Sequence, residues 1–466
     1  MKKQAFNPYL PSWEYIPDGE PYVFGDRVYI YGSHDFFNGY VFCPGDYMCY
    51  SAPIDDLGNW RCEGVIYGRC DDPINKDGKM CLYAPDVTVG PDGRYYLYYA
   101  LDKRPIMSVA VSDTPAGRYE FYGYVHYEDG TRLGEREGDE PSFDPGVITD
   151  NGVTYLYSGF CGNGDLSRTG SRVMTMADDM LTIVSEPTTI VPGCMYSAGT
   201  GFEGHAFFEA SSIRKVNNKF YLIYSSEVMH ELCYAVSDTP MGEFRYGGVI
   251  VSNCDIGIDS YKPADMPAAY GANNHGSIIE INGEWYIFYH RQTGGNWYSR
   301  QGCAEKIEIN SDGSINQVTI TSCGLNGGPL MGEGEYPAYL ACNLFTDEPH
   351  MYVGDTNMPK IIQDGRDGDE NPGYVANVVK NTYIGFKYFD CKGVTAIKVT
   401  TRGYASGIME VRLAYDGEAV GSVNLEFSNV WETYETKVDI PDGIHAIYLV
   451  FKGDGNASVK SFELVR

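Results

Sequence analysis

The sequence predicts an all-β protein in which a five-bladed β-propeller is followed by a β-sandwich (jelly-roll) module. The composition includes 40 Tyr and 55 Gly, with an aromatic share of 14%, and this favours strands joined by tight turns. A repeated hairpin pattern predicts five blades, because units of about four strands repeated radially form a propeller. An open β-sandwich of the same length is the alternative, which the regular repeat disfavours.

The repeated unit is a hydrophobic strand, a turn with Gly or Asn, and a tyrosine-rich strand of alternating side chains. It occurs at residues 22–31, 87–98, 147–157, 213–221 and 278–286. Aligning one tyrosine from each copy gives steps of 67, 59, 66 and 65 residues between Tyr29, Tyr96, Tyr155, Tyr221 and Tyr286. The hexapeptide Ala-Val-Ser-Asp-Thr-Pro also occurs twice, at residues 110–115 and 235–240. We therefore predict that the propeller spans residues 1–325.

The remaining chain lacks this repeat. Residues 326–339 are predicted to be a linker, and residues 340–466 contain short alternating strands such as 396–400 and 409–413, separated by Gly-rich turns. This pattern predicts a small β-sandwich.

Charge and composition restrict the partners. The net charge of −28 disfavours nucleic acid and anionic membranes, which are bound by clustered Lys and Arg. No apolar run approaches the ~20 residues of a membrane span. Residues 1–8 contain no signal-peptide pattern, so we expect a cytoplasmic protein as written, or a secreted one if a signal was removed. The 13 Cys include no Cys-x-x-Cys pair and are expected to be buried free thiols.

One position of the repeat carries the candidate site. The residue ten to twelve places before each aligned tyrosine is, in order, Asp18, Asp86, Asp144, Glu209 and His275. In a propeller these positions converge on the central axis, where crowded carboxylates raise one another's pKa. Each acidic residue could instead stabilise a turn, but four acidic residues and a histidine in phase favour a site. Convergent carboxylates without a phosphate loop, a nucleophile elbow or a zinc motif suit cleavage of a glycosidic bond.

The motifs around these residues resemble glycoside hydrolase family 43, whose members are five-bladed propellers and inverting enzymes that act on arabinofuranosides and β-xylosides. The resemblance covers about residues 5–325. The segment Asn7-Pro8-Tyr9-Leu10-Pro11 with the following Pro17-Asp18 resembles the family's opening, 83–86 resembles its Trp-Ala-Pro-Asp stretch, and 207–211 resembles its Glu-Ala-Ser segment. The resemblance implies that Asp18 is the general base, Glu209 the general acid, and Asp86 the aspartate that orients the acid and raises its pKa.

Further matches suggest how substrate is bound. The segments 274–277 and 289–291 imply that His275 lies in the central channel near water or a cation, and that Arg291 lies near the substrate. Asp144 is a further candidate. The aromatic residues Trp13, Phe36, Phe207 and Trp297 are candidates for stacking on sugar, with core packing as the equal alternative.

These matches predict a single displacement that releases terminal α-L-arabinofuranosyl units from arabinoxylan or its oligosaccharides, with Asp18 and Glu209 carboxyls ~6.5–9.5 Å apart. A β-D-xylosidase or exo-arabinanase on the same fold, a retaining fructosidase-type propeller and a non-catalytic sugar-binding propeller are the alternatives. No cofactor is expected.

Residues 430–451 resemble family 6 carbohydrate-binding modules, in which a tryptophan at the place of Trp431 stacks on sugar. The positions at which that family holds a structural calcium correspond here to Ala341-Cys342 and Val459-Lys460-Ser461, so a calcium ion is left open. A module that only supports the propeller is the alternative.

Overall fold

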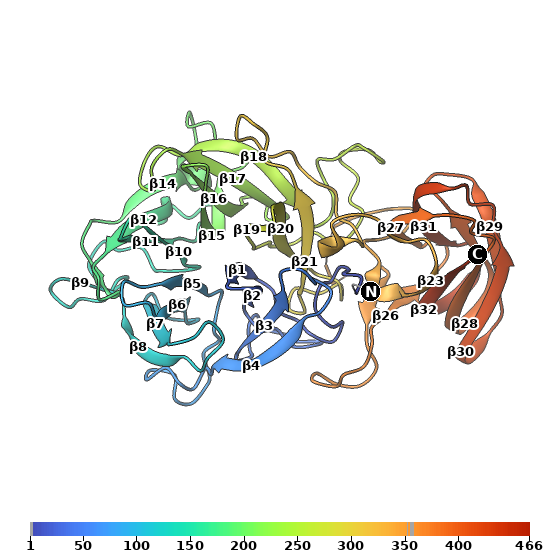
Figure 1. Cartoon of the computed structure of the whole chain (residues 1–466), viewed down its shortest axis with the longest axis horizontal. Coiled ribbons are helices and arrows are strands. Elements are labelled where there is room, and N and C mark those ends of the chain that lie inside the picture. The colour runs from blue at the N-terminus through green and yellow to red at the C-terminus, as the bar shows by residue number, and fades with distance from the viewer. Residues whose placement is uncertain (1–2, 352, 355–357) are drawn as a thin grey trace.

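The computed structural model describes residues 3–351, 353–354 and 358–466, and it confirms the all-β class with five blades around a central axis (Figure 1). The first two blades are β1 (Glu20–Phe24), β2 (Arg27–Tyr31), β3 (Tyr47–Pro53) and β4 (Arg61–Tyr67), then β5 (Asp86–Val89), β6 (Tyr95–Ala100), β7 (Met107–Ser112) and β8 (Glu120–Tyr124). The third contains β10 (Gly146–Asp150), β11 (Val153–Ser158), β12 (Gly170–Met176), β13 (Thr182–Ile183) and β14 (Thr188–Pro192), with β9 (His126–Tyr127) paired to β13. The fourth and fifth are β15 (Phe207–Val216), β16 (Lys219–Ser226), β17 (Glu231–Ser237) and β18 (Arg245–Ser252), then β19 (Ile278–Ile281), β20 (Glu284–Arg291) and β21 (Gln301–Ile307).

The predicted hairpins are the first two strands of each blade. The five aligned tyrosines all lie in the second strand, in β2, β6, β11, β16 and β20. The β10–β11 turn is Asn151-Gly152 with φ of 50° and 80°, and the β19–β20 turn is Asn282-Gly283 with φ of 53° and 80°. Two residues with positive φ form the type I′ connection whose twist matches that of the strands, which explains why Asn and Gly mark these places.

The propeller ring is closed by the N-terminal segment. Blade five has three strands, and the chain before β1 runs beside it: the amide of Tyr9 donates to the carbonyl of Gly302 (3.1 Å), and that of Asn7 to the carbonyl of Ser322 (3.1 Å). The Asn7 side chain donates to the carboxylate of Glu305 (2.9 Å). Blades one and five are therefore joined by residues from opposite ends of the propeller sequence.

The C-terminal module is a curled sheet that folds over its own hydrophobic core. Its strands are β22 (Leu330–Met331), β23 (Gly334–Pro337), β24 (Asn343–Phe345), β25 (Lys360–Ile362), β26 (Tyr374–Val378), β27 (Tyr383–Cys391), β28 (Ala396–Arg412), β29 (Ala419–Leu425), β30 (Ser428–Lys437), β31 (Gly443–Phe451) and β32 (Asp454–Val465). The long strand β28 pairs with β30 and β32 along its first part and with β29 and β31 along its last.

Short 3-10 helices lie at Cys194–Tyr196, Gly324–Asn326 and Ala338–Leu340.

The predicted linker 326–339 belongs to this module, because β22 pairs with β27 and β23 with β32. The module packs against the propeller through buried polar contacts. Lys387 pairs with Asp255 at 3.1 Å, and Arg291 donates to the carbonyl of Cys342 (3.0 Å).

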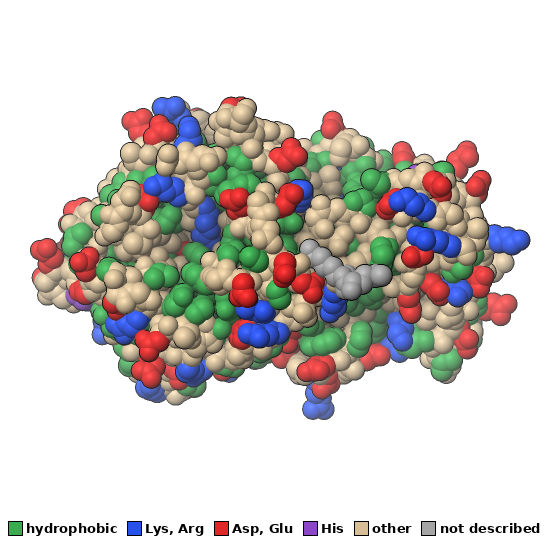
Figure 2. Space-filling view, in the orientation of Figure 1, with side chains coloured by type: hydrophobic (Ala, Val, Ile, Leu, Met, Phe, Trp, Pro, Cys, Tyr) green, Lys and Arg blue, Asp and Glu red, His purple; other side chains and the backbone are tan. Residues whose placement is uncertain are grey.

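Figure 2 shows acidic and basic side chains interspersed over the face in view. Among the described residues, no helix is long and apolar enough to cross a membrane.

Candidate active site

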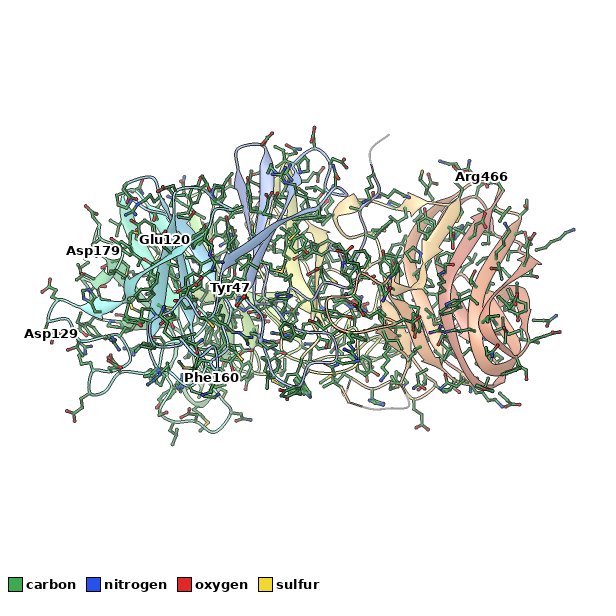
Figure 3. All side chains as sticks on the ribbon, turned by 90° about the horizontal axis from the view of Figure 1, so that it is seen from below. Tyr47, Glu120, Asp129, Phe160, Asp179 and Arg466 are labelled. Carbon is green, nitrogen blue, oxygen red and sulfur yellow. The ribbon has the colours of Figure 1, made fainter. Side chains whose placement is uncertain are left out.

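A cavity of about 740 Å³ lies in the propeller and contains four of the five predicted axial residues. They are Asp18, Asp144, Glu209 and His275, joined by Arg300. Much of the remaining wall is aromatic: Phe42, Tyr83, Phe143, Phe160, Phe208, Trp297 and Tyr298. Phe160 lies toward the lower side of the propeller in Figure 3, with Tyr47 further inside. Such a concave site with few polar groups and many apolar ones is typical of small-molecule binding.

Asp18 lies just before β1 and is held as an anion. Arg300 donates to one carboxylate oxygen at 2.9 Å, and the imidazole nitrogens of His290 and His275 lie 3.2 and 4.0 Å from it. Burial would raise the pKa of Asp18, but the Arg300 guanidinium and the two imidazoles outweigh it and hold that pKa well below its usual range. Asp18 is therefore a carboxylate at any working pH.

Glu209 is held as a neutral acid. It is 9% exposed, and burial, with the nearby Asp144 and Asp18 carboxyls, raises its pKa to about 8. Asp18 and Glu209 therefore differ in charge at neutral pH because their environments differ.

The backbone around Glu209 is irregular. The register of β15 against β16 shifts on both sides of Glu209, and Ala210 has a φ of 69°. The Ala210 amide donates to the Asp144 carboxylate at 3.1 Å. A bulge changes where a strand's side chains point, so this one fixes Glu209 beside Asp144. Asp144 itself has its pKa raised to about 7 by burial.

Asp86 occupies a different place from the one predicted. One of its oxygens accepts from the Tyr22 hydroxyl (2.6 Å) and the Val87 amide (2.8 Å), and the other from the Val147 amide (2.7 Å). Burial and then the Glu20 carboxylate raise its pKa to about 7. Asp86 lies outside the cavity lining. The residue beside Glu209 is Asp144, whereas the sequence predicts Asp86 there.

The channel behind His275 already contains a cation. Arg214 donates to Glu20 at 2.6 Å, and His275 Nε2 lies 3.6 Å from the other Glu20 oxygen. Those last two atoms have no hydrogen-bond partner of their own, because 3.6 Å is too long for a direct hydrogen bond. A metal ion fits poorly, because the Arg214 guanidinium is bound to the same carboxylate and would repel it.

A family model for glycosyl hydrolases family 43 matches residues 16–315. The chain belongs to glycoside hydrolase family 43. It is therefore an inverting glycoside hydrolase. It is 64% identical to a xylosidase/arabinosidase of Thermoclostridium stercorarium over 470 residues, covering 100% of this chain and 99% of the relative. It is also 28% identical to an arabinoxylan arabinofuranohydrolase of Paenibacillus polymyxa, over 96% of this chain and 71% of the relative.

Solved structures of family 43 enzymes share the fold. The arabinoxylan arabinofuranohydrolase of Bacillus subtilis, solved with cellotetraose, aligns with a TM-score of 0.53 and 23% identity over 99% of this chain and 97% of its own. A β-xylosidase/α-arabinofuranosidase from a compost microbial metagenome, solved with xylotriose, aligns with a TM-score of 0.52 and 29% identity over 66% of this chain and 97% of its own.

In this family 43 enzyme the predicted sugar-binding residues are divided. Trp297 lines the cavity, whereas Trp13 and Phe36 lie outside its lining. Phe207 is fully buried in the core of blades three and four, and its neighbour Phe208 lines the cavity instead, because adjacent strand residues point to opposite faces. Arg291 contacts the C-terminal module, and the arginine that binds Asp18 is Arg300.

Arg300 is the charged partner of Asp18 that sequence reasoning missed. It pairs with Asp18 and also with Asp35 (2.8 Å), and it lies 282 residues from Asp18 in the chain. The one signal in the sequence was its place directly before the third strand of blade five, which the hairpin alignment did not cover.

In the C-terminal module, Trp431 is partly buried and packs edge-on against Tyr374 (5.3 Å), with the Arg402 guanidinium 4.3 Å from its ring. The positions compared with a calcium site are unsuited to one. Cys342 is fully buried, and Lys460 contributes a positive charge that lies 6.0 Å from the Trp431 ring. Calcium binds oxygen ligands, so these residues do not fit it.

Proposed function

We propose that this family 43 enzyme is an α-L-arabinofuranosidase that removes terminal arabinofuranosyl units from arabinoxylan or its oligosaccharides. The observation that carries the proposal is the pairing, in one cavity, of an ionised carboxylate at Asp18 with a neutral carboxylic acid at Glu209. Hydrolysis with inversion needs these two groups in these two states. The relatives' names supply the class of sugar.

In the proposed reaction Glu209 donates its proton to the departing glycosidic oxygen. Asp18 accepts a proton from a water molecule that attacks the anomeric carbon on the opposite face. The glycosidic C–O bond breaks as the new C–O bond forms, and the sugar leaves with inverted configuration. The Arg300 guanidinium positions Asp18 and keeps it deprotonated.

We assign to Asp144 the role that the sequence gave to Asp86. Asp144 is bonded to the amide that follows Glu209, and after burial it is the largest cause of the raised pKa of Glu209. Asp86 uses both oxygens to join β1, β5 and β10, which supports a structural role in the channel.

Release of β-D-xylosyl units is a second candidate activity. It is supported by the relative at 64% identity, which is named for both sugars. The aromatic wall of the cavity suits either pentose, because sugars stack their apolar faces on aromatic rings.

Hydrolysis of nitrophenyl α-L-arabinofuranoside and nitrophenyl β-D-xyloside by the wild type tests the sugar preference. Release of arabinose from arabinoxylan oligosaccharides by the wild type and by Glu209→Gln tests the general acid, because a sugar leaving group, unlike nitrophenolate, needs a proton. The matched control is Glu305→Gln, because Glu305 is also a buried glutamate whose burial raises its pKa to about 8 but lies outside the cavity lining. We expect the arabinoside to be preferred, with kcat falling by at least about 100-fold in Glu209→Gln and far less in the control.

The anomer released, followed by NMR during the first turnovers, reports inversion. Preference for the xyloside would move the assignment to a β-xylosidase. Equal activity of Glu209→Gln and the wild type would refute the catalytic assignment.

A further inference from the structure

Three side chains of kinds that bind transition metals meet in blade four, outside the cavity described above. They are His205, in the segment before β15, and Glu231 and Cys233 on β17. The His205 Nδ1 and Glu231 Oε1 atoms are 2.6 Å apart, the Cys233 sulfur is 3.4 Å from the same oxygen, and it is 4.0 Å from Nδ1. We propose that these residues bind a Zn²⁺ ion.

The three ligand atoms form a triangle close to the one that zinc requires. Zinc bonds of about 2.0–2.1 Å to nitrogen, about 2.0–2.2 Å to a carboxylate oxygen and about 2.3 Å to sulfur, at tetrahedral angles, separate these ligand atoms by roughly 3.3 to 3.6 Å. The sulfur–oxygen and sulfur–nitrogen distances fall within about half an ångström of this range. The nitrogen–oxygen pair is closer because the two atoms share a proton, which an incoming metal ion would replace.

The surrounding contacts hold the ligands in place. Glu231 and Cys233 are alternate residues of one strand, so their side chains leave it on the same face. The His205 ring stacks on Tyr246, with centroids 4.8 Å apart and an interplanar angle of 12°. The Tyr224 hydroxyl donates to the carbonyl of His205 at 2.8 Å. Ligands fixed by such neighbours lose little freedom when a metal binds.

Burial leaves one side of the triangle open. Cys233 is fully buried and the Glu231 side chain is 7% exposed, whereas the His205 side chain is 36% exposed. A metal ion can therefore enter past the imidazole, and water can fill a fourth position there. Three protein ligands and one water form a common arrangement for zinc.

The ligand set favours zinc over harder ions. Thiolate and imidazole ligands suit zinc, while calcium and magnesium prefer oxygen. Binding releases the thiol proton of Cys233 and the proton shared by His205 and Glu231, so the thiolate and carboxylate balance the charge of Zn²⁺. The resulting buried site is neutral, which avoids the cost of an unpaired buried charge.

The proposed ion would attach the segment before β15 to β17. His205 precedes Glu209 by four residues, and the next amide, that of Ala206, donates to Glu227 at 3.2 Å. Zinc bound here would stabilise the start of the strand that carries Glu209.

Metal-free, full-length protein titrated with ZnCl₂ in a calorimeter tests the proposal, with Cys233→Ser and His205→Gln as the variants. Cys62→Ser is the control, because it removes an exposed thiol on β4. We expect one equivalent bound by the wild type and by the control, with a raised melting temperature. Affinity should fall by at least about tenfold in each variant.

Co²⁺ provides an independent readout, because thiolate ligation gives a sulfur-to-cobalt charge-transfer band in the near ultraviolet. We expect this band in the wild type and in Cys62→Ser, and not in Cys233→Ser. Circular dichroism of each metal-free variant verifies that it is folded. No zinc binding by the wild type, or unchanged binding and an unchanged cobalt band in folded Cys233→Ser, would overturn the proposal.

Discussion

The ion pair between Arg300 and Asp18 is expected to determine the acid side of the pH–activity profile. Substitution of Arg300 by Met removes the guanidinium that donates to Asp18 at 2.9 Å. Two unit charges whose centres are about 4 Å apart interact by about 4 kcal/mol at an effective dielectric constant of about 20. Since one pKa unit corresponds to about 1.4 kcal/mol, the pKa of Asp18 should rise by about 3 units.

The assay is kcat/KM on nitrophenyl arabinofuranoside as a function of pH, since its acid limb reports the base of the free enzyme. Because the pKa of Asp18 in the wild type lies well below its usual range, we expect the wild type to show no acid limb from Asp18 at working pH. In Arg300→Met the limb should appear near the ordinary carboxyl pKa of about 4. Arg300→Lys is the matched control, because it keeps the positive charge, and its profile should show no acid limb at working pH.

The same substitution leaves Asp18 and Asp35 buried without their cation. It should therefore lower the free energy of unfolding by about 3–5 kcal/mol, so the profile must be recorded well below the melting temperature of the variant. A pH profile of folded Arg300→Met that shows no acid limb, like that of the wild type, would refute the electrostatic reasoning.

Three other predictions concern the remaining site residues. Asp144→Asn should move the alkaline limb of kcat/KM to lower pH by about 1 unit or more, because it removes a charge that raises the pKa of Glu209. The control, Asp86→Asn, should leave the position of that limb unchanged. The carboxyls of Glu209, Asp144 and Asp86 have pKa values raised to about 8, 7 and 7. Between about pH 4 and 8 these groups therefore hold more protons in the folded protein than in the unfolded chain, so their contribution to stability falls as pH rises. Thermal melting from pH 5 to 8 should show this fall, and it should be smaller in Glu209→Gln; an equal fall in both proteins would contradict the assignment. Phe208→Ala should raise KM with little change in melting temperature, whereas Phe207→Ala should cost about 3–5 kcal/mol of stability because it leaves a cavity in the core; a reversal of these two effects would show that the side chains are misassigned.

Much of the fold was predictable because each blade begins with the same local pattern. The hairpin turns need Asn or Gly for their positive φ, so the repeat is visible in the letters, and its phase places Asp18, Asp144, Glu209 and His275 around one cavity. In each of the five blades, one aligned tyrosine correctly located the second strand.

The positions of several site residues could not be predicted, because they depend on contacts between segments that are far apart in the sequence. Asp86 has the right phase but lies outside the cavity lining, because the Tyr22 hydroxyl and two backbone amides hold its carboxylate. The sequence does not show which face of β15 each side chain occupies, so it could not tell that Phe207 lies in the core and Phe208 in the cavity wall. The pairing of Arg300 with Asp18 joins two residues 282 positions apart, which no local pattern reveals.

The closure of the ring by the N-terminal segment makes activity a reporter of complete folding. Asp18 comes from the first blade and Arg300 from the last, and they meet only after blade five has joined the chain that precedes β1. During synthesis, a ribosome must release nearly the whole propeller before the base acquires its guanidinium. A nascent or truncated chain that lacks blade five is therefore expected to be catalytically silent, and recovery of turnover during refolding would time the last step of ring assembly.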